Sequence, residues 1–183
     1  MSVERWTLVG IPADTPVAEA TAEDYVFSGT TEFSHEMESE LLERVVGKKK
    51  DWNQGVVEET ISVTFGYDKD VKADRALLES IKNGKQMRFW IINNEIITLT
   101  DGTAKGHNST FAYVMAESRS LSVDDEEQTI EGSFKVKLNS AEGEEPKLPD
   151  VILDPSLAAA VVYEEIGAAE GNMEDAPTQN LTP

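Results

Sequence analysis

The stretch VEETISVTFGY, residues 57–67, alternates apolar and polar side chains over most of its length. An alternation with a period of two is typical of a β-strand that places one face on a hydrophobic core and the other in water. The apolar face holds Val57, Ile61, Val63, Phe65 and Tyr67, and the polar face holds Glu58, Thr60, Ser62 and Thr64. This stretch therefore predicts a protein built on β-strands.

Three other segments agree with a mainly β architecture. Ile130–Leu138 repeats the alternation, and Ser109–Val123 shows it more weakly over a longer length. Met87–Ile92 reads MRFWII, and a nearly continuous apolar run of this length predicts a central strand that is covered on both faces. The two asparagines that follow tolerate positive φ, so we expect a hairpin between this strand and Glu95–Leu99.

One helix is predicted, at about Val71–Asn83. A stripe of small and apolar side chains recurs there at the helical spacing of 3.6 residues. Asp68 or Asp70 can cap the start, and Gly84 suits the left-handed position after the last turn. The stripe holds Ala73, Ala76, Leu77, Ser80 and Ile81. We therefore expect a mainly β fold, a β-sandwich or β-barrel with one helix packed on a face.

Residues 37–55 are harder to assign. Met37–Val46 fits a helix, with apolar side chains four residues apart, and equally a strand, with alternate glutamates on one face. Gly47–Gly55 is predicted to be a loop between two glycines. It carries three consecutive lysines, the only basic cluster of the chain, close to Trp52.

Charge limits the classes of partner. The chain has 183 residues with 16 Lys or Arg and 35 Asp or Glu, so its formal net charge is −19. Such a protein lacks the cations that binding to the outside of DNA or RNA requires, and an anionic membrane repels it. It has no cysteine, and its longest apolar run, Leu157–Tyr163, is far shorter than the ~20 residues of a membrane span. We expect a soluble chain without a membrane partner.

Composition suggests how the chain is divided. Residues 141–183 carry ten acids and one base, a local charge of −9, together with five of the seven prolines. We expect this segment to be an acidic C-terminal arm. Residues 26–140 are then the folded β-domain, and residues 1–25 are an N-terminal arm.

No catalytic, cofactor-binding or metal-binding apparatus is predicted. The two histidines, His35 and His107, cannot form a zinc site alone. Asp68, Asp70 and Asp74 resemble the start of a calcium loop but lack its glycine and its final glutamate, so helix capping explains them better. The sequence also lacks the common phosphate-binding and hydrolase motifs. We therefore expect neither an enzyme nor a cofactor.

Several short sequence segments follow one another in a set order. A predicted helix that ends LLESIKNG at residues 77–84 runs directly into KQMRFW at 85–90. The segments FAYVMAESR at 111–119 and QTIEGSFKVKL at 128–138 follow, and then an acidic segment that contains proline. The order and spacing of these segments, over about residues 28–155, resemble those of the major tail proteins of long-tailed siphophages.

This resemblance implies a tail tube subunit with a β-sandwich flanked by a helix. Proteins of that family form hexameric rings, and the rings stack into a tube that conducts viral DNA. The implied partners are further copies of the chain, the tape measure, tail terminator and distal tail proteins, and double-stranded DNA that passes without specific binding. The implied location is the virion tail, with assembly in the host cytoplasm.

The resemblance also indicates two groups of candidate residues. Residues 47–55 lie where the family has a long loop that reaches the adjacent ring. The candidates for contacts between rings are therefore Lys48, Lys49, Lys50, Asp51 and Trp52. An anionic channel wall would enclose DNA without strong phosphate contacts. The candidates for this wall are Glu36, Glu38, Glu40, Glu58, Glu59 and Glu131.

A ligand-binding β-sandwich, such as a carbohydrate-binding module, is the alternative. Exposed aromatic side chains on a sheet face or a loop would favour it, because they offer platforms for sugar rings. Trp52 meets this condition, whereas Phe89 and Trp90 are expected to be buried.

Overall fold

The structure is a computed structural model that describes residues 3–67, 71–100, 102, 104–123 and 127–153. The chain divides into two compact units, Met1–Leu148 and Pro149–Pro183. The described part of the second unit consists of residue 149 and the short helix α3, Asp150–Leu153. Most of the acidic segment expected to be an arm therefore lies outside the described residues.

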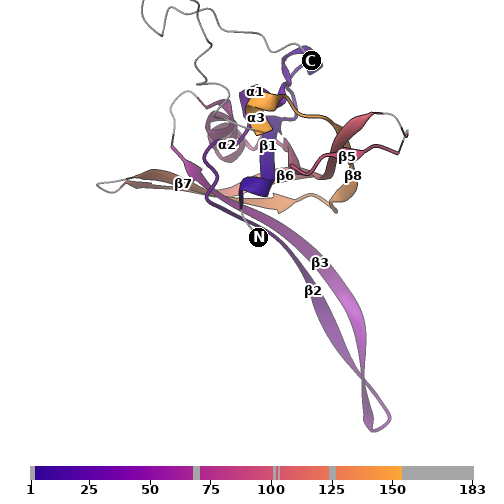
Figure 1. Ribbon diagram of the computed structural model, residues 1–183. Helices are drawn as coiled ribbons and strands as arrows, with labels where there is room; N and C mark the ends of the chain where they lie inside the picture. The colour runs from indigo at the N-terminus through magenta and orange to yellow at the C-terminus, as the bar shows by residue number, and fades with distance from the viewer. Residues whose placement is uncertain (1–2, 68–70, 101, 103, 124–126, 154–183) are drawn as a thin grey trace, which may run out of the picture. The chain divides into compact units, whose positions relative to one another are not determined.

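The strands of the first unit form one antiparallel sheet, which Figure 1 shows. The order is β1-β4-β6-β7-β3-β2, and β5 and β8 pair with β6 beside this path. The strands are β1 Trp6–Pro12, β2 Glu32–Val46, β3 Lys49–Gly66, β4 Met87–Asn93, β5 Ile97–Thr98, β6 Lys105–Val123, β7 Gln128–Val136 and β8 Ala141–Pro146. The helices are η1 Val3–Arg5, η2 Val17–Glu19, α1 Ala22–Tyr25 and α2 Lys72–Asn83.

The long strand β6 joins the two halves of the sheet. Its first half pairs with β4 along one edge and with β8 along the other, whereas its second half pairs with β7. The register shifts between Ala116 and Ser118, and a bulge of this kind bends a strand. The sheet can therefore curve around a core and remain one continuous ladder.

The core lies on the inner face of this sheet. Four phenylalanines meet there, with neighbouring ring centroids 5.0–6.1 Å apart, and each is at most 2% exposed. They are Phe27, Phe65, Phe89 and Phe134. Ile61 and Val63 lie beside Phe65 on the same face, as the alternation in residues 57–67 predicts. Burial of such apolar surface contributes roughly 25 cal/mol per Å² to folding.

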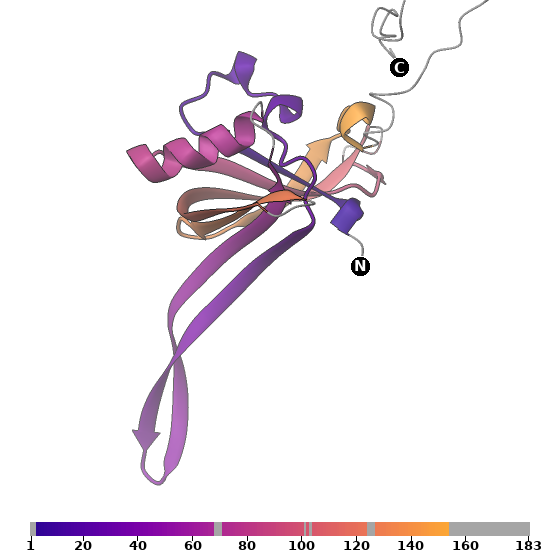
Figure 2. The same ribbon diagram turned by 90° about the vertical axis from the view of Figure 1, so that its left-hand side faces the viewer.

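The helix α2 covers this core, and Figure 2 shows it lying against the sheet. Leu77 is fully buried on the predicted stripe, whereas Ile81 is 39% exposed. The chain leaves the helix through Gly84, whose φ of 64° is the left-handed conformation that glycine adopts without strain. The expected caps Asp68 and Asp70 lie outside the described residues.

The strands β2 and β3 form a long hairpin, which resolves the ambiguous part of the sequence. Figures 1 and 2 show the two strands running side by side to their tip. Residues 37–46 are strand and not helix. The prediction of a loop at residues 47–55 is wrong, because only Gly47 (φ 66°) and Lys48 form the turn and β3 begins at residue 49. Of the two glycines that bounded the expected loop, Gly47 lies in the turn, whereas Gly55 lies within strand β3.

The outer part of this hairpin has no further strand neighbour in the described chain. Only Thr60–Gly66 of β3 pairs with β7. The register between β2 and β3 shifts where Glu40 stands opposite both Gly55 and Val56. Gly55 therefore marks a bulge within a strand rather than the end of a loop.

Three other expectations differ from the structure. β5 pairs with β6 and not with β4, and Glu95 N donates to Asn93 Oδ1, so the asparagines form a local turn without a hairpin. β1 pairs with β4 and buries Leu8, so residues 1–25 do not form a separate arm. β8 pairs with β6, and the first compact unit extends to Leu148 rather than ending at residue 140. In each case a short or acidic segment is held by pairing with a neighbouring strand.

Candidate functional site

A polar face covers one side of β2, β3, β7 and the second half of β6. The register places Ser34 opposite Ser62, and Ser62 opposite Ser133, so hydroxyl groups form a row across three strands. The side chains next to this row are Glu32, Glu36, Glu38, Glu58, Thr60, Thr64, Ser118, Ser120, Ser122, Thr129, Glu131 and Lys135. We call this set the polar face.

Acidic groups dominate the polar face. Its lysine, Lys135, lies 3.6 Å from a carboxylate oxygen of Glu58 and donates to the Thr60 hydroxyl at 3.0 Å. Four of the glutamates predicted to form an anionic wall share this surface. They are Glu36, Glu38, Glu58 and Glu131. Glu40 lies at the bulge, where the pairing of the two strands is interrupted, so its register does not assign it to this face.

Glu59 does not belong to the polar face. Because neighbouring residues of a strand face opposite sides of the sheet, Glu59 points to the core side, opposite to Glu58, and it is 8% exposed. Its carboxylate accepts hydrogen bonds from the Ser140 amide at 3.1 Å and from His35 Nε2 at 3.3 Å. Burial alone would raise the pKa of Glu59, but these hydrogen bonds outweigh it and the pKa lies below its usual value. The alternation in residues 57–67 already places position 59 on the apolar side.

The tip of the hairpin carries the residues predicted to contact another ring. All five are exposed and lie in the turn or in the first residues of β3: Lys48, Lys49, Lys50, Asp51 and Trp52. Lys50 Nζ lies 3.0 Å from the carboxylate of Glu43 on the facing strand. Among the described residues, Lys48 and Lys49 have no such ion pair, so their charges are available at the surface.

The hairpin also has an apolar face, which sequence reasoning missed. Strand alternation gathers these side chains on the side that continues from the core, and each is 43–65% exposed. They are Met37, Leu41, Val45, Trp52 and Val57, and we call them the apolar hairpin face. The signal was present as the four-residue spacing within β2, since residues i, i+4 and i+8 share a face in a strand as well as in a helix. A row of exposed apolar side chains indicates an interaction surface.

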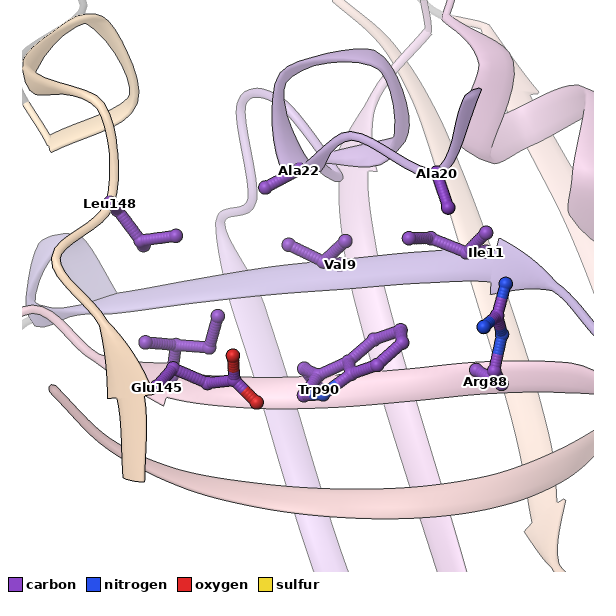
Figure 3. A pocket seen from close by; sticks show the side chains of 9 residues that line it. Val9, Ile11, Ala20, Ala22, Arg88, Trp90, Glu145 and Leu148 are labelled. Carbon is purple, nitrogen blue, oxygen red and sulfur yellow. The ribbon is translucent and has the colours of Figure 1, made fainter. Parts of the chain in front are cut away.

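A pocket of about 220 Å³ lies between β1, β4 and β8 (Figure 3). Its walls are formed mainly by Val9, Ile11, Ala20, Ala22, Ile92 and Leu148. Burial raises the pKa of Glu145 at one end, and a hydrogen bond from the Trp90 indole only partly offsets this. At the other end Arg88 donates to the Thr15 carbonyl at 3.2 Å. No pattern in the sequence indicated this pocket.

The described residues contain no cluster of three or more His, Asp or Glu side chains that could hold a metal ion. His107 is fully buried, and its Nδ1 lies within hydrogen-bonding distance, 3.0 Å, of the Asn93 carbonyl oxygen. We therefore assign this histidine a structural role. Asp74 is paired with Arg119 rather than aimed at a cation site. Within the same described ranges, no helix is long and apolar enough to cross a membrane.

The curved antiparallel sheet with its flanking helix and long hairpin is the fold of tail tube proteins. The tail tube of SPP1, solved by solid-state NMR and cryo-EM, matches with a TM-score of 0.66 and 17% identity over 98% of this chain and 99% of that one. The tail of a gene transfer agent particle, refined with C6 symmetry, matches with a TM-score of 0.56 and 10% identity over 78% of this chain and 98% of that one. No family model matches the chain.

A sequence relative defines the family. A putative tail protein of Staphylococcus phage phiMR11 is 38% identical over 178 residues, which are 96% of this chain and 92% of that protein. The chain therefore belongs to the family of phage tail proteins. The predicted family of phage tail proteins and the mainly β fold are therefore confirmed.

Proposed function

We propose that the protein is the subunit of the phage tail tube and that its polar face lines the DNA channel. The observation that carries this proposal is the acidic, hydroxyl-rich surface that spans four strands. DNA binds strongly where cations replace its condensed counterions, and this surface offers carboxylates instead. A wall of this kind encloses the duplex without holding it.

Two free strand edges support the assembly of such a wall. Among the described residues, β2 pairs only with β3, and residues 118–123 of β6 pair only with β7. Unpaired edges of this length readily pair with another chain. Joining the β6 edge of one copy to the β2 edge of the next continues both the ladder and the polar face around a closed ring. The C6 symmetry of the gene transfer agent tail supports six copies in the ring.

The hairpin supplies the contact between rings. Its apolar face is exposed in the isolated chain and becomes buried when it packs on an adjacent ring, which favours association. Lys48 and Lys49 add positive charge at the tip of a molecule whose net charge is −19. Complementary charges of this kind set the register of a contact more than its strength.

The remaining partners follow from the place of a tube in a tail. They are the tape measure, tail terminator and distal tail proteins, together with double-stranded DNA inside the channel. The protein occupies the virion tail and assembles in the host cytoplasm. Electron microscopy of the purified protein, combined with size-exclusion chromatography, tests the proposal. Six-fold rings or tubes are expected, and a chain that stays monomeric at all concentrations contradicts it.

A further inference from the structure

Leu138, in the turn between β7 and β8, is the most exposed of the large apolar side chains in the described chain. It is 96% exposed. It is also the one described residue other than glycine with a positive φ, which is 67°. A bulky side chain in this conformation is a genuine outlier that marks strain.

Hydrogen bonds close this turn tightly. The Asn139 amide donates to the Lys137 carbonyl at 3.0 Å, which forms a three-residue γ-turn with Leu138 at its centre. A γ-turn whose central residue has positive φ is rare and strained. The Lys137 amide donates to the Tyr113 carbonyl at 2.7 Å, so β6 holds the entrance of the turn in place.

The exit of the turn is tied to the root of the hairpin. The Ser140 amide donates to the buried Glu59 carboxylate at 3.1 Å, and His35 Nε2 lies 3.3 Å from the same oxygen. Glu59 pairs with Met37 and lies two residues from Val57, on the same side of the strand. The turn therefore lies next to the start of the apolar hairpin face.

The isolated subunit gains nothing from a leucine at this position. The side chain buries almost no surface, so it contributes no hydrophobic stabilisation, while its backbone conformation costs free energy. Glycine would satisfy the same turn without strain. A strained residue that persists under these conditions points to a role outside the folding of the monomer.

We propose that Leu138 is an apolar anchor by which one copy of the chain docks on another. The partner is a second copy, because the turn that carries Leu138 lies next to the apolar hairpin face proposed to mediate assembly, and the inference rests on that proposed function. The Glu59 carboxylate is the positioning group, since it fixes the turn that presents the leucine. Docking buries the Leu138 side chain, and the hydrophobic free energy of this burial offsets the free energy that the strained turn costs.

The substitution Leu138→Gly separates this role from a structural one, because its two effects have opposite signs. The isolated subunit should become more stable, with Tm raised by about 2–5 °C, since the strain is released. Assembly should become weaker, with the critical concentration for tube formation raised about 10- to 100-fold, as expected for loss of one buried leucine per contact. Tm is measured by calorimetry below the assembly concentration, and assembly is measured by light scattering and pelleting.

Two matched variants of the full-length chain keep the strained backbone and change only the side chain. Leu138→Met should assemble at nearly the wild-type concentration, because methionine remains apolar. Leu138→Gln should lose assembly as Leu138→Gly does, without the gain in Tm. Normal assembly of both the glycine and the glutamine variants overturns the proposal, and so does equal loss in all three variants. If the unchanged chain forms no rings or tubes, the proposed function itself fails, and that outcome is read from the wild type alone.

Discussion

At the scale of the residue, Asp74 and Arg119 hold α2 to β6 through a bidentate ion pair. Arg119 Nε lies 2.7 Å from one carboxylate oxygen, and a terminal guanidinium nitrogen lies 2.9 Å from the other. Both side chains are largely buried, and the hydrogen bonds to Asp74 raise the pKa of Arg119. The pair therefore behaves as a buried one, in which loss of one partner leaves an unpaired charge.

Asp74→Ala should lower the free energy of unfolding by about 3 kcal/mol, measured by urea denaturation of the unassembled subunit. The matched control is Asp24→Ala, which removes the exposed ion pair with Lys72 at 2.7 Å. That control should change the free energy of unfolding by no measurable amount, because solvent screens the pair. Equal effects of the two substitutions would contradict the argument.

A second prediction at the scale of the residue concerns Glu59 and the dependence of stability on pH. Its pKa in the folded chain lies below the usual value of 4.5, so the carboxylate contributes stability above that value and loses it as the pH falls through the folded pKa. The Tm of the wild type should therefore fall as the pH is lowered from 6 towards 3, and Glu59→Gln should fall less steeply. Calorimetry across this range measures both slopes. Identical slopes would show that Glu59 contributes nothing to the acid sensitivity.

At the scale of the element, the hairpin shows what the sequence could and could not predict. The inner half of β3 was predictable, since Ile61, Val63 and Phe65 face a core and alternate with polar residues. The outer half faces no core of its own chain, so nothing within the monomer selects its pattern. Its apolar side chains were therefore compatible with a helix, and the bulge at Gly55 suggested a loop.

The polar face was only partly predictable for the same reason. Glu36, Glu38, Glu58 and Glu131 could be chosen as acids on polar strand positions, but their common surface depends on the pairing of β2, β3 and β7. Strand order is a long-range property that alternation within one segment does not contain. The apolar hairpin face and the position of Leu138 also depend on the strand order.

Neighbouring leucines of β2 offer a matched test of the apolar hairpin face. Leu41 stands opposite Gln54 and Leu42 opposite Asn53, so the two side chains point to opposite faces of the hairpin. Leu41→Ser should raise the critical concentration for assembly by about tenfold or more, and Leu42→Ser should raise it much less. Both leucines are exposed in the subunit, so Tm should stay nearly constant in both variants. Light scattering and calorimetry provide the two readouts, and similar assembly of the two variants argues against this face.

A separate prediction concerns the positive charge at the tip of the hairpin and its effect on tube elongation. Lys48→Glu/Lys49→Glu should block elongation of tubes without unfolding the subunit, because the positive end of the contact is reversed. Lys50 is left unchanged, since it already pairs with Glu43. Arg75→Glu/Lys82→Glu on the exposed side of α2 gives the same change in net charge and serves as the control. Tube lengths in electron micrographs decide the matter, and tubes of normal length from the tip variant refute the contact.

At the scale of the whole molecule, net charge opposes assembly, and under the proposed function it would favour the passage of DNA. A ring of six copies would carry 6 × −19 = −114 formal charges. Salt screens such repulsion over about 8 Å at physiological ionic strength, so the edge and hairpin contacts must act at short range. The polar face concentrates part of this charge where a duplex would pass.

Reversing three charges on the polar face tests whether it lines the channel. Glu36→Lys/Glu38→Lys/Glu131→Lys changes the net charge per copy from −19 to −13, and Glu58 is kept because it contacts Lys135. Tubes of this variant should retain a short DNA duplex at low salt and release it steeply as salt increases, because lysines replace the condensed counterions of the phosphates. Wild-type tubes should retain little duplex, as measured by filter binding.

Location is separated from charge by two comparisons within this experiment. Duplex held inside a tube is shielded from nuclease, whereas duplex bound on the outside is digested, so protection should accompany retention. The variant with glutamine at the same three positions removes charge without adding cations, and its tubes should behave like the wild type. Retained DNA that remains sensitive to nuclease would place the polar face on the outer surface of the tube. The free edges of β2 and β6 would then have to be joined in a ring of the opposite curvature.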